Sequence, residues 1–384
     1  MTEWNGGAGP RIVAIGGGTG LSTMLRGLKS RTRSLTAIVT VADDGGGSGM
    51  LRQDLGMPPP GDIRHCMEAL ANAEPMMQQL LTYRFPEGSG NLTGQSFGNL
   101  ILAALNGVTG SFEEAVSQMS QVLAITGQVI PVTSANVQLE AVFENGVRVV
   151  GESKIYHVKK EQDCRIAHVA LIPEHPAPLP AALAAIREAD LILMGPGSLY
   201  TSVIPNLLVE GVVEAICRSE ALKIYVCNIM TQEGETEGYT AADHVDALLS
   251  HGAPGLVDLC LANSAPVRPG LVEKYREEDA APILVDRERI RAMGLELEEY
   301  PVASEGGDYA RHDPDRLAAA VLGLFLPGPA ALLALPAALP TLYVQRMADA
   351  LAALPFAALS IQSVYLKLWL ALVYVLLLLY LLGR

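Results

Sequence analysis

A glycine-rich turn near the start of the chain has the composition of a phosphate-binding loop. It is Gly16-Gly17-Gly18-Thr19-Gly20, directly after the apolar run 11–15. Glycines let backbone amides approach an anion closely, and a helix that starts after such a turn directs its positive end toward the same point. The turn is not a Walker loop, because no Gly-Lys-Ser or Gly-Lys-Thr follows it. These residues predict a phosphate site, and the alternative is a tight turn from strand to helix that binds nothing.

A second turn of the same kind follows the apolar run 190–194. It contains Gly195, Gly197 and Ser198, and a later apolar run ends at Asn228. We predict that the first three residues bind phosphate and that Asn228 faces a sugar or a metal. A serine nucleophile needs a nearby base, and the seven histidines show no spacing that supplies one. We therefore predict no nucleophilic role for Ser198, and no catalytic residue is assigned.

Two adjacent carboxylates, Asp43 and Asp44, follow the apolar run 35–41. On an extended chain adjacent side chains point to opposite sides, so one could face a ligand while the other caps the glycine-rich stretch 45–49. A carboxylate in this place suits a sugar hydroxyl, a ribose diol, or Mg²⁺ that also binds phosphate oxygens. We predict that the pair faces a sugar or a metal, with Asp44 as the metal ligand. The alternative is two ordinary turn residues.

The composition excludes some classes of protein. The chain has 384 residues, with 27 Lys and Arg against 41 Asp and Glu, so its formal net charge is −14. A general nucleic-acid binder needs a basic footprint, and we expect no nucleic-acid partner. The five cysteines are scattered, without a disulfide framework or paired metal spacing. We therefore expect reduced thiols, as in cytosolic proteins.

Two arginines stand out because cations are scarce in this chain. Arg64 and Arg311 each precede a histidine. Either guanidinium could bind a diphosphate through charge-assisted hydrogen bonds. The alternative for each is an ion pair at the surface.

Strand and helix patterns alternate through most of the chain, and this alternation must position the residues named above. It predicts an α/β fold with a mostly parallel sheet and helices on both faces. The segments 137–143 and 147–152, joined by Asn145-Gly146, predict a small antiparallel hairpin insertion. In parallel sheets ligands bind beyond the carboxyl ends of the strands, and the glycine turns and Asp43 fall at such ends.

Three local expectations follow from the pattern around the first two apolar runs. Apolar residues recur at helical spacing from Leu21 to Leu28, which predicts a helix that starts near Leu21. The glycines of 45–49 predict irregular structure. Asp62 has the position and the side chain of a cap for a helix that runs to about Ala73.

The end of the chain differs sharply from the rest in charge. We predict a flexible N-terminus at 1–10, an α/β domain at 11–316, and an apolar tail at 317–384 that is rich in Leu, Ala and Pro. This tail carries only four charged residues, and its segment 368–383 is uncharged and free of proline. A membrane span needs about 20 apolar residues, so the segment suffices only if it extends past Lys367. We expect membrane contact; the alternatives are a helix packed on the domain or in an oligomer, and a segment not native to this protein.

Six short segments, taken in order, carry a resemblance to a known family. They are Ile-Gly-Gly-Gly-Thr-Gly-Leu-Ser (15–22), Val-Thr-Val-Ala-Asp-Asp-Gly-Gly (39–46), Pro-Gly-Asp-Ile-Arg (60–64), Phe-Gly-Asn-Leu (97–100), Gly-Pro-Gly-Ser-Leu-Tyr-Thr-Ser (195–202) and Met-Thr-Gln-Glu-Gly-Glu-Thr (230–236). As a set they resemble the YvcK-like gluconeogenesis factors of bacteria, which are related to the CofD-like 2-phospho-L-lactate transferases. The resemblance covers about residues 11–315 and leaves the end of the chain outside.

The resemblance implies a cytoplasmic, Rossmann-like α/β protein that binds a nucleotide sugar and acts in carbon metabolism and in cell-wall or cell-shape control. It implies ligand-site roles for Gly17, Gly18, Thr19, Asp43, Asp44, Asn99, Gly197 and Ser198. Arg311 resembles the basic residue that precedes the family's last helix and helps to hold a nucleotide diphosphate. This chain departs from the family in two places: Gly47 stands where Ser is common, and Gln95 stands where His is common. The loss of that histidine weakens the case for acid–base catalysis.

Two functions remain open from the sequence. The first is a regulator that senses a UDP-sugar and links carbon flux to envelope synthesis. The second is a transferase that acts on a nucleotide-activated donor with Mg²⁺, the metal that its relatives imply. We favour the regulator, because a deazaflavin acceptor must stack on aromatic rings and aromatic residues are sparse near the motifs. We also expect the chain to form a homo-oligomer.

Overall fold

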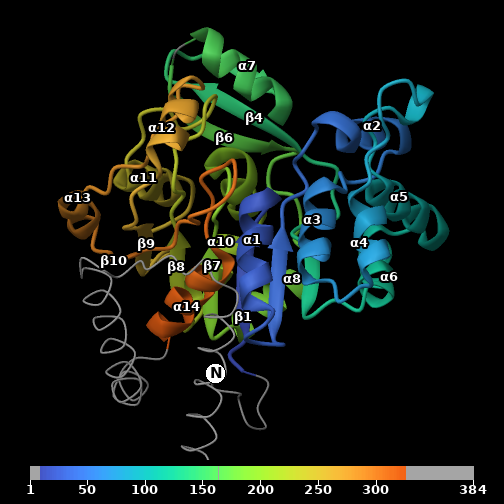
Figure 1. Cartoon of the computed structure of the whole chain (residues 1–384), viewed down its shortest axis with the longest axis horizontal. Coiled ribbons are helices and arrows are strands. Elements are labelled where there is room, and N and C mark those ends of the chain that lie inside the picture. The colour runs from blue at the N-terminus through green and yellow to red at the C-terminus, as the bar shows by residue number, and fades with distance from the viewer. Residues whose placement is uncertain (1–8, 163, 326–384) are drawn as a thin grey trace, which may run out of the picture. The chain divides into compact units, whose positions relative to one another are not determined.

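Seven parallel strands form the main sheet, in the spatial order β10-β9-β8-β7-β1-β2-β3 (Figure 1). The structure is a computed structural model that describes residues 9–162 and 164–325. The strands are β1 (Ile12–Gly16), β2 (Leu35–Val39), β3 (Gln128–Pro131), β7 (Leu191–Met194), β8 (Leu222–Val226), β9 (Leu259–Asn263) and β10 (Glu296–Tyr300). The predicted parallel sheet is therefore confirmed.

The order of the strands reverses beside β1. The chain passes from β1 to β2 and β3 on one side, and later builds β7, β8, β9 and β10 on the other side. In register, Ile15 of β1 lies opposite Ile38 of β2 and Met194 of β7. Adjacent parallel strands whose connections diverge leave a crevice at their carboxyl ends. The glycine turns after β1 and β7 both lie at this switch point.

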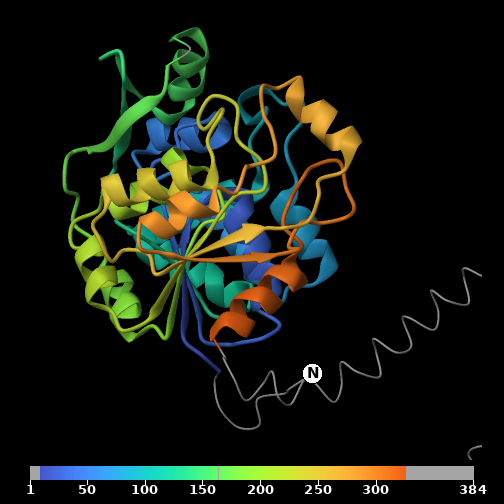
Figure 2. The same ribbon diagram turned by 90° about the vertical axis from the view of Figure 1, so that its left-hand side faces the viewer.

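Helices cover both faces of the main sheet (Figure 2). On one face α1 (Gly18–Leu28) packs against α3 (Gly61–Leu70) and α14 (Pro314–Phe325). The other face is covered by α9 (Ile204–Leu207), α10 (Val212–Arg218), α11 (Ala241–His251) and α13 (Arg287–Ala292) (Figure 2). Helix α12 (Pro269–Arg276) lies apart from them, toward the carboxyl ends of the strands (Figure 1). The remaining helices are α2 (Gly46–Leu55), α4 (Pro75–Thr82), α5 (Phe97–Thr109), α6 (Phe112–Val122), α7 (Glu152–Gln162) and α8 (Pro180–Glu188).

The core of the main sheet follows from the apolar pattern of its elements. Every residue of β1 is buried, as expected for a central strand covered on both faces. The apolar residues that predict α1, from Leu21 to Leu28, are also fully buried. Helical spacing places them on one face of α1, and this face packs on the sheet.

A small antiparallel sheet lies beyond the carboxyl ends of the main strands. The predicted hairpin is confirmed as β4 (Gln138–Phe143) and β5 (Arg148–Val150), and β6 (Ile166–Ile172) adds a third strand along β4. The segment 147–152 is not all strand, because Glu152 already begins α7. This insertion places α7 near the end of the main sheet that carries the glycine turns (Figure 1).

The local expectations around the first two strands differ from the structure. α1 begins at Gly18 rather than near Leu21, so the glycine turn is itself the first helical turn. The stretch 45–49 is largely helical, since α2 begins at Gly46. A Cβ on Gly49 would lie 2.0 Å from the carbonyl oxygen of Asp44, so this packed turn requires the glycine that seemed to argue against a helix.

Two further expectations also need correction. The cap position of α3 belongs to Pro60, and Asp62 lies in the first turn without capping its own helix. At the other end of the chain, Leu317 does not begin a separate tail. It lies within α14, and its side chain is buried together with Val321. One compact unit extends to Phe325, and residues 326–384 lie outside the described part of the chain.

The membrane expectation falls mostly on those last residues, which the structure does not describe. Within residues 9–162 and 164–325, no single helix combines the length and the apolar composition that a bilayer span requires. Only the consecutive helical segments 199–207 and 212–218 meet that requirement together, and they are bent by 76°.

Candidate functional site

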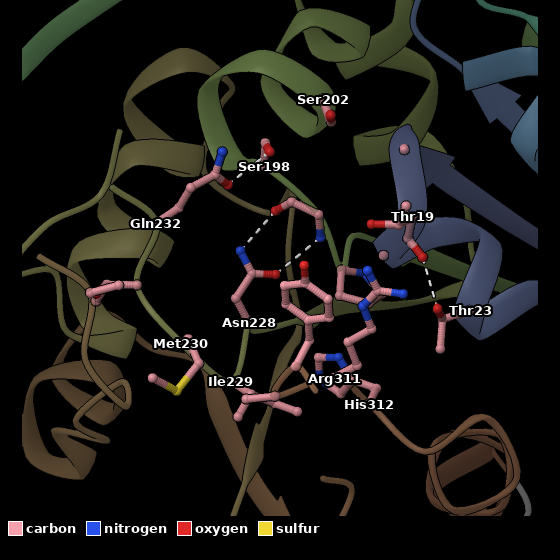
Figure 3. Close-up of a pocket in the computed structure, with 18 of the residues that line it drawn as sticks. Thr19, Thr23, Ser198, Ser202, Asn228, Ile229, Met230, Gln232, Arg311 and His312 are labelled. Atoms are coloured by element: carbon pink, nitrogen blue, oxygen red, sulfur yellow. Dashed lines mark hydrogen bonds between the residues drawn. The ribbon is translucent and has the colours of Figure 1, made fainter. Parts of the chain in front are cut away.

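A cavity of about 470 Å³ opens at the carboxyl ends of β1, β7 and β8, at the switch point of the sheet. It brings together residues from six distant parts of the chain, four of which are labelled in Figure 3. The predicted site residues that line it are Gly17, Gly18, Thr19, Gly20, Gly197, Ser198, Asn228 and Arg311. The two glycine turns and the predicted cation therefore share one site.

The two glycine turns touch each other through their backbones. A Cβ on Gly20 would lie 2.5 Å from the carbonyl oxygen of Pro196 and 3.0 Å from the Cα of Gly197. Gly16 and Gly195 do not line the cavity. They lie behind it, where the N–H of Gly195 donates to the carbonyl of Ile15 at 2.9 Å. Their part is to hold the two turns at adjacent strand ends.

The N-terminus of α1 opens into the cavity. Gly17 occupies the cap position and brings no side chain to accept from the first amides of the helix. The carboxylate of Asp62 accepts a hydrogen bond from the N–H of Gly18. The first four amides of a helix lack partners within the helix, so those of Thr19 and Gly20 remain for a ligand. This end of α1 also carries the positive end of the helix dipole.

Arg311 supplies a positive charge to the same cavity. It comes from the loop before α14, and its guanidinium lies 5.1 Å from the ring centre of Tyr309. Figure 3 shows its side chain between Asn228 and Thr19. Among the described residues, no carboxylate forms an ion pair with this guanidinium. A cation in a cavity without an internal partner can bind an anionic ligand.

Arg64, the other arginine considered from the sequence, lies elsewhere. Its side chain is buried between α3 and α5, where Nε donates to Oδ1 of Asn99 at 2.8 Å and the guanidinium pairs with Glu68. Burial also lowers the pKa of the neighbouring His65 to about 4. Arg64 is therefore neither a surface residue nor a part of the cavity.

The remaining predicted site residues, Asp43, Asp44 and Asn99, do not line the cavity. Oδ1 of Asp43 accepts from the N–H of Gly45 at 2.8 Å, within the turn before α2, and α2 itself has no side-chain cap. Oδ1 of Asp44 accepts from the N–H of Ser153 at 2.7 Å, in the first turn of α7. Asn99 is buried and contacts Arg64 on one side and Ser48 on the other.

Four carboxylates form a group between the first glycine turn and α7: Asp43, Asp44, Asp62 and Glu152. Burial and the neighbouring carboxylates raise the pKa of Glu152 to about 8. Burial and Asp43 raise the pKa of Asp62 to about 7. Burial likewise raises the pKa of Asp43. Carboxyl groups that exchange protons near neutral pH can act as acids or bases, so this carboxylate group has the chemistry of a general acid–base site.

A magnesium ion finds no complete set of ligands in the described residues. No three side chains of His, Cys, Asp or Glu in residues 9–162 and 164–325 are arranged to hold a metal ion. Asp44, the predicted metal ligand, already accepts from the N–H of Ser153.

Asn228 and Ser198 are engaged within the protein. Both ends of the Asn228 amide bond to the backbone of Gly197, accepting from its N–H at 3.0 Å and donating to its carbonyl at 2.8 Å. The hydroxyl of Ser198 donates to Oε1 of Gln232 at 2.8 Å. Asn228 therefore shapes the second glycine turn.

Sequence reasoning missed three tyrosines in the walls of the cavity, Tyr156, Tyr275 and Tyr309. They come from α7, from α12 and from the loop before α14. None lies in a motif, and nothing in their spacing connects them. The segment 230–233, at the start of a motif that received no site role, lines the cavity as well.

The two departures from the family pattern touch each other. A Cβ on Gly47 would lie 2.7 Å from Oε1 of Gln95, and this oxygen is buried without a partner in the described residues. The smaller residue at position 47 therefore makes room for the glutamine side chain. The departures form one local change beside Ser48 and Asn99.

Known proteins are similar to this chain over most of its length. Residues 12–303 match the family described as 2-phospho-L-lactate transferase CofD. The gluconeogenesis factor of Bacillus subtilis is 49% identical over 315 residues, which are 82% of this chain and 98% of that protein. A protein of Thermoanaerobacterium thermosulfurigenes is 53% identical over 316 residues, 82% of this chain and 97% of that one.

A solved structure extends the similarity to the fold. The crystal structure of a UPF0052 family member from Bacillus halodurans is 46% identical in sequence, with a TM-score of 0.78. It covers 81% of this chain and 99% of that chain. The similarity thus includes nearly the whole of these relatives.

Proposed function

This chain belongs to the CofD family and, within it, to the gluconeogenesis factors, and on that premise we propose that it is a cytoplasmic regulator that binds a UDP-sugar. By binding it, the protein would report the supply of sugar nucleotides and link carbon metabolism to cell-wall synthesis and cell shape. The resemblance suggests this role, and the cavity supplies its physical basis.

The observation that carries the proposal is the pairing of an open helix end with an unpaired guanidinium. Thr19 and Gly20 at the start of α1 face the cavity that also holds Arg311. A diphosphate is the part of a nucleotide sugar that needs both backbone amides and a cation. Because the chain is acidic overall, this local positive site selects an anion that can reach it.

The cavity has walls that suit the rest of the ligand. Its volume, about 470 Å³, lies in the range of small-molecule sites. Tyr275 and Tyr309 stand near Arg311 and can stack on a nucleobase. Glu233 also lines the cavity, but Lys160 pairs with it at 2.6 Å, which lowers the pKa of that carboxyl and offsets its charge.

A transferase remains the second candidate, and two observations favour it. The three tyrosines remove the argument that aromatic residues are too sparse for an acceptor ring to stack. Asp62 touches the first glycine turn and has a pKa of about 7, within a carboxylate group that also contains Glu152. Such a group could accept a proton from an attacking hydroxyl.

The two functions are separated by binding and turnover measured on the same protein. We expect UDP-N-acetylglucosamine to bind in calorimetry with EDTA present, and Asp44→Asn to cost only a modest factor, because an amide can replace a carboxylate as an acceptor from Ser153. Incubation with Mg²⁺ and analysis by mass spectrometry should yield no transferred product. Strict dependence of binding on Mg²⁺, together with a detected product, would establish the transferase instead. No binding of any nucleotide sugar in a panel would end the proposal.

A further inference from the structure

The motif at 230–236 runs along the second glycine turn. Its first residues line the cavity, and Gln232 accepts a hydrogen bond from Ser198. The hydroxyl of Thr236 accepts from the N–H of Gln232 at 3.0 Å, which closes the segment on itself. The motif is therefore a folded unit that contacts the turn through side chains.

Glu235 makes the most unusual of these contacts. Its residue is only 2% exposed, and Oε1 accepts from the N–H of Tyr200 and from the N–H of Thr201, both at 2.8 Å. These amides belong to the short π-helical segment Leu199–Val203 that follows the second glycine turn. A buried carboxylate of the protein thus occupies the place where a bound anion would meet a helix start.

We propose that Glu235 is a positioning residue of the nucleotide-sugar site: it fixes the second glycine turn from behind and leaves the open end of α1 and Arg311 as the place for the diphosphate. This inference rests on the proposed function for its ligand. It assigns different tasks to two turns that look alike in the sequence. The first turn binds phosphate, and the second forms a rigid wall.

The turn is held at three successive points, of which Glu235 is the last. Asn228 bonds to the backbone of Gly197, Gln232 accepts from the hydroxyl of Ser198, and Glu235 accepts from the two amides that follow. The first two contacts involve exposed or half-buried groups, whereas in the third the carboxylate of Glu235 and the amide of Tyr200 are buried and the amide of Thr201 is half-buried. Loss of the third contact would leave two inward-facing amides without an acceptor, which is costly in a dry environment.

The acceptor oxygen of Glu235 matters more than its negative charge. Burial raises the pKa of Glu235 to about 7, and the hydrogen bonds from Thr201 and Tyr200 only partly oppose this shift. Oε2 has no hydrogen-bond partner among the described residues. Tyr225 from β8 and Glu152 from α7 interact electrostatically with this carboxyl group, and neither side chain carries a positive charge. A neutral amide in the same place should therefore hold the turn equally well.

The test compares three substitutions at this position. Glu235→Ala removes the acceptor, Glu235→Asp keeps the charge but withdraws the acceptor by one methylene, and Glu235→Gln keeps the acceptor without charge. In calorimetry with UDP-N-acetylglucosamine we expect the Ala and Asp variants to bind at least about tenfold more weakly and the Gln variant to stay within about threefold of the wild type. Asp190→Ala is the matched control, because Asp190 also accepts from a backbone N–H, that of Arg11 at 2.8 Å, at the opposite end of β7. It should bind within twofold of the wild type.

Hydrogen exchange provides a second readout that needs no ligand. The amides of Tyr200 and Thr201 should exchange faster in the Ala and Asp variants and at the wild-type rate in the Gln variant. Wild-type affinity in folded Glu235→Ala, or Glu235→Gln as weak as Glu235→Ala, would overturn the inference. If the wild type binds no nucleotide sugar, the proposed function fails, and unchanged exchange at these two amides in Glu235→Ala would separately refute the positioning role.

Discussion

Replacing Gly20 by alanine should weaken ligand binding because it forces the two glycine turns apart. The added Cβ would lie 2.5 Å from the carbonyl oxygen of Pro196, about 0.9 Å inside the 3.4 Å at which ordinary contact begins. The obstacle is the backbone of the second glycine turn, since the Cα of Gly197 would also lie only 3.0 Å from the added Cβ. No rotamer change can relieve the contact, so one turn must move.

The size of the effect follows from the cost of overpacking. An extra methyl group in a closely packed place costs about 1–3 kcal/mol, and each 1.4 kcal/mol changes affinity tenfold. If the cavity absorbs most of this strain, the affinity for a nucleotide sugar should fall about 5- to 150-fold. The fold itself should survive, because Gly20 lies at the edge of the cavity and is only partly buried.

Two other glycines provide matched controls. A Cβ on Gly16, in the same sequence motif, would meet its nearest neighbours at 3.8 Å, which is ordinary contact. Gly107, within α5, has no atom within 4 Å of the same position. Gly16→Ala and Gly107→Ala should therefore bind like the wild type in calorimetry. Normal affinity in Gly20→Ala, or an equal loss in Gly16→Ala, would refute the idea that contact between the turns shapes the site.

Arg311→Ala should lower the affinity for a UDP-sugar about 10- to 150-fold without unfolding the protein, since a charge-assisted contact contributes about 1.5–3 kcal/mol. The control is Arg287→Ala, which removes only a pair with Glu299 at the surface and should leave the affinity unchanged. Equal affinities of the two variants in calorimetry would remove Arg311 from the site. The pKa of Glu152 is raised to about 8, from an ordinary 4.5. Between about pH 5 and 8 the folded state therefore keeps a proton on Glu152 that the unfolded state has lost. The free energy of unfolding should fall as the pH rises through this range. Glu152→Gln should therefore be more stable than the wild type at pH 8.5, by a difference on the order of 4 kcal/mol that disappears near pH 5 in urea titrations. A constant difference across this range would contradict the assigned pKa. If the tail contacts a membrane, the full chain should pellet with vesicles. A chain cut after Phe325 keeps the whole of α14 and should stay in the supernatant. Equal solubility of both chains without detergent would contradict the membrane expectation.

The sequence alone predicted the architecture because its signals are local. Runs of apolar residues mark the parallel strands, helical spacing marks the buried face of α1, and Asn145-Gly146 marks the hairpin. The topology of a parallel sheet then places both glycine turns and Asn228 on the same side of the sheet, because the carboxyl ends of all its strands lie there. The conformation of these residues is determined by residues close to them in the sequence.

Only the tertiary structure decided which polar residues share the cavity. Asp43 and Asp44 follow a strand of the same sheet, yet they turn toward α2 and α7, where their carboxylates accept hydrogen bonds from the N–H groups of Gly45 and Ser153. The stretch that begins at Gly46 is helical, and its packing against the carbonyl of Asp44 leaves no room for a side chain at Gly49.

The tyrosines of the cavity and the contact of Glu235 with the second turn also lie beyond the reach of local signals. Tyr156 and Tyr309 lie far apart in the sequence, and Glu235 accepts from the amide of Tyr200 across 35 residues. Such contacts depend on how helices and loops dock on the sheet, and that docking is set by the summed packing of the whole domain. The sequence by itself determined the sheet and the turns at its edge, whereas the long-range packing determined which side chains complete the site.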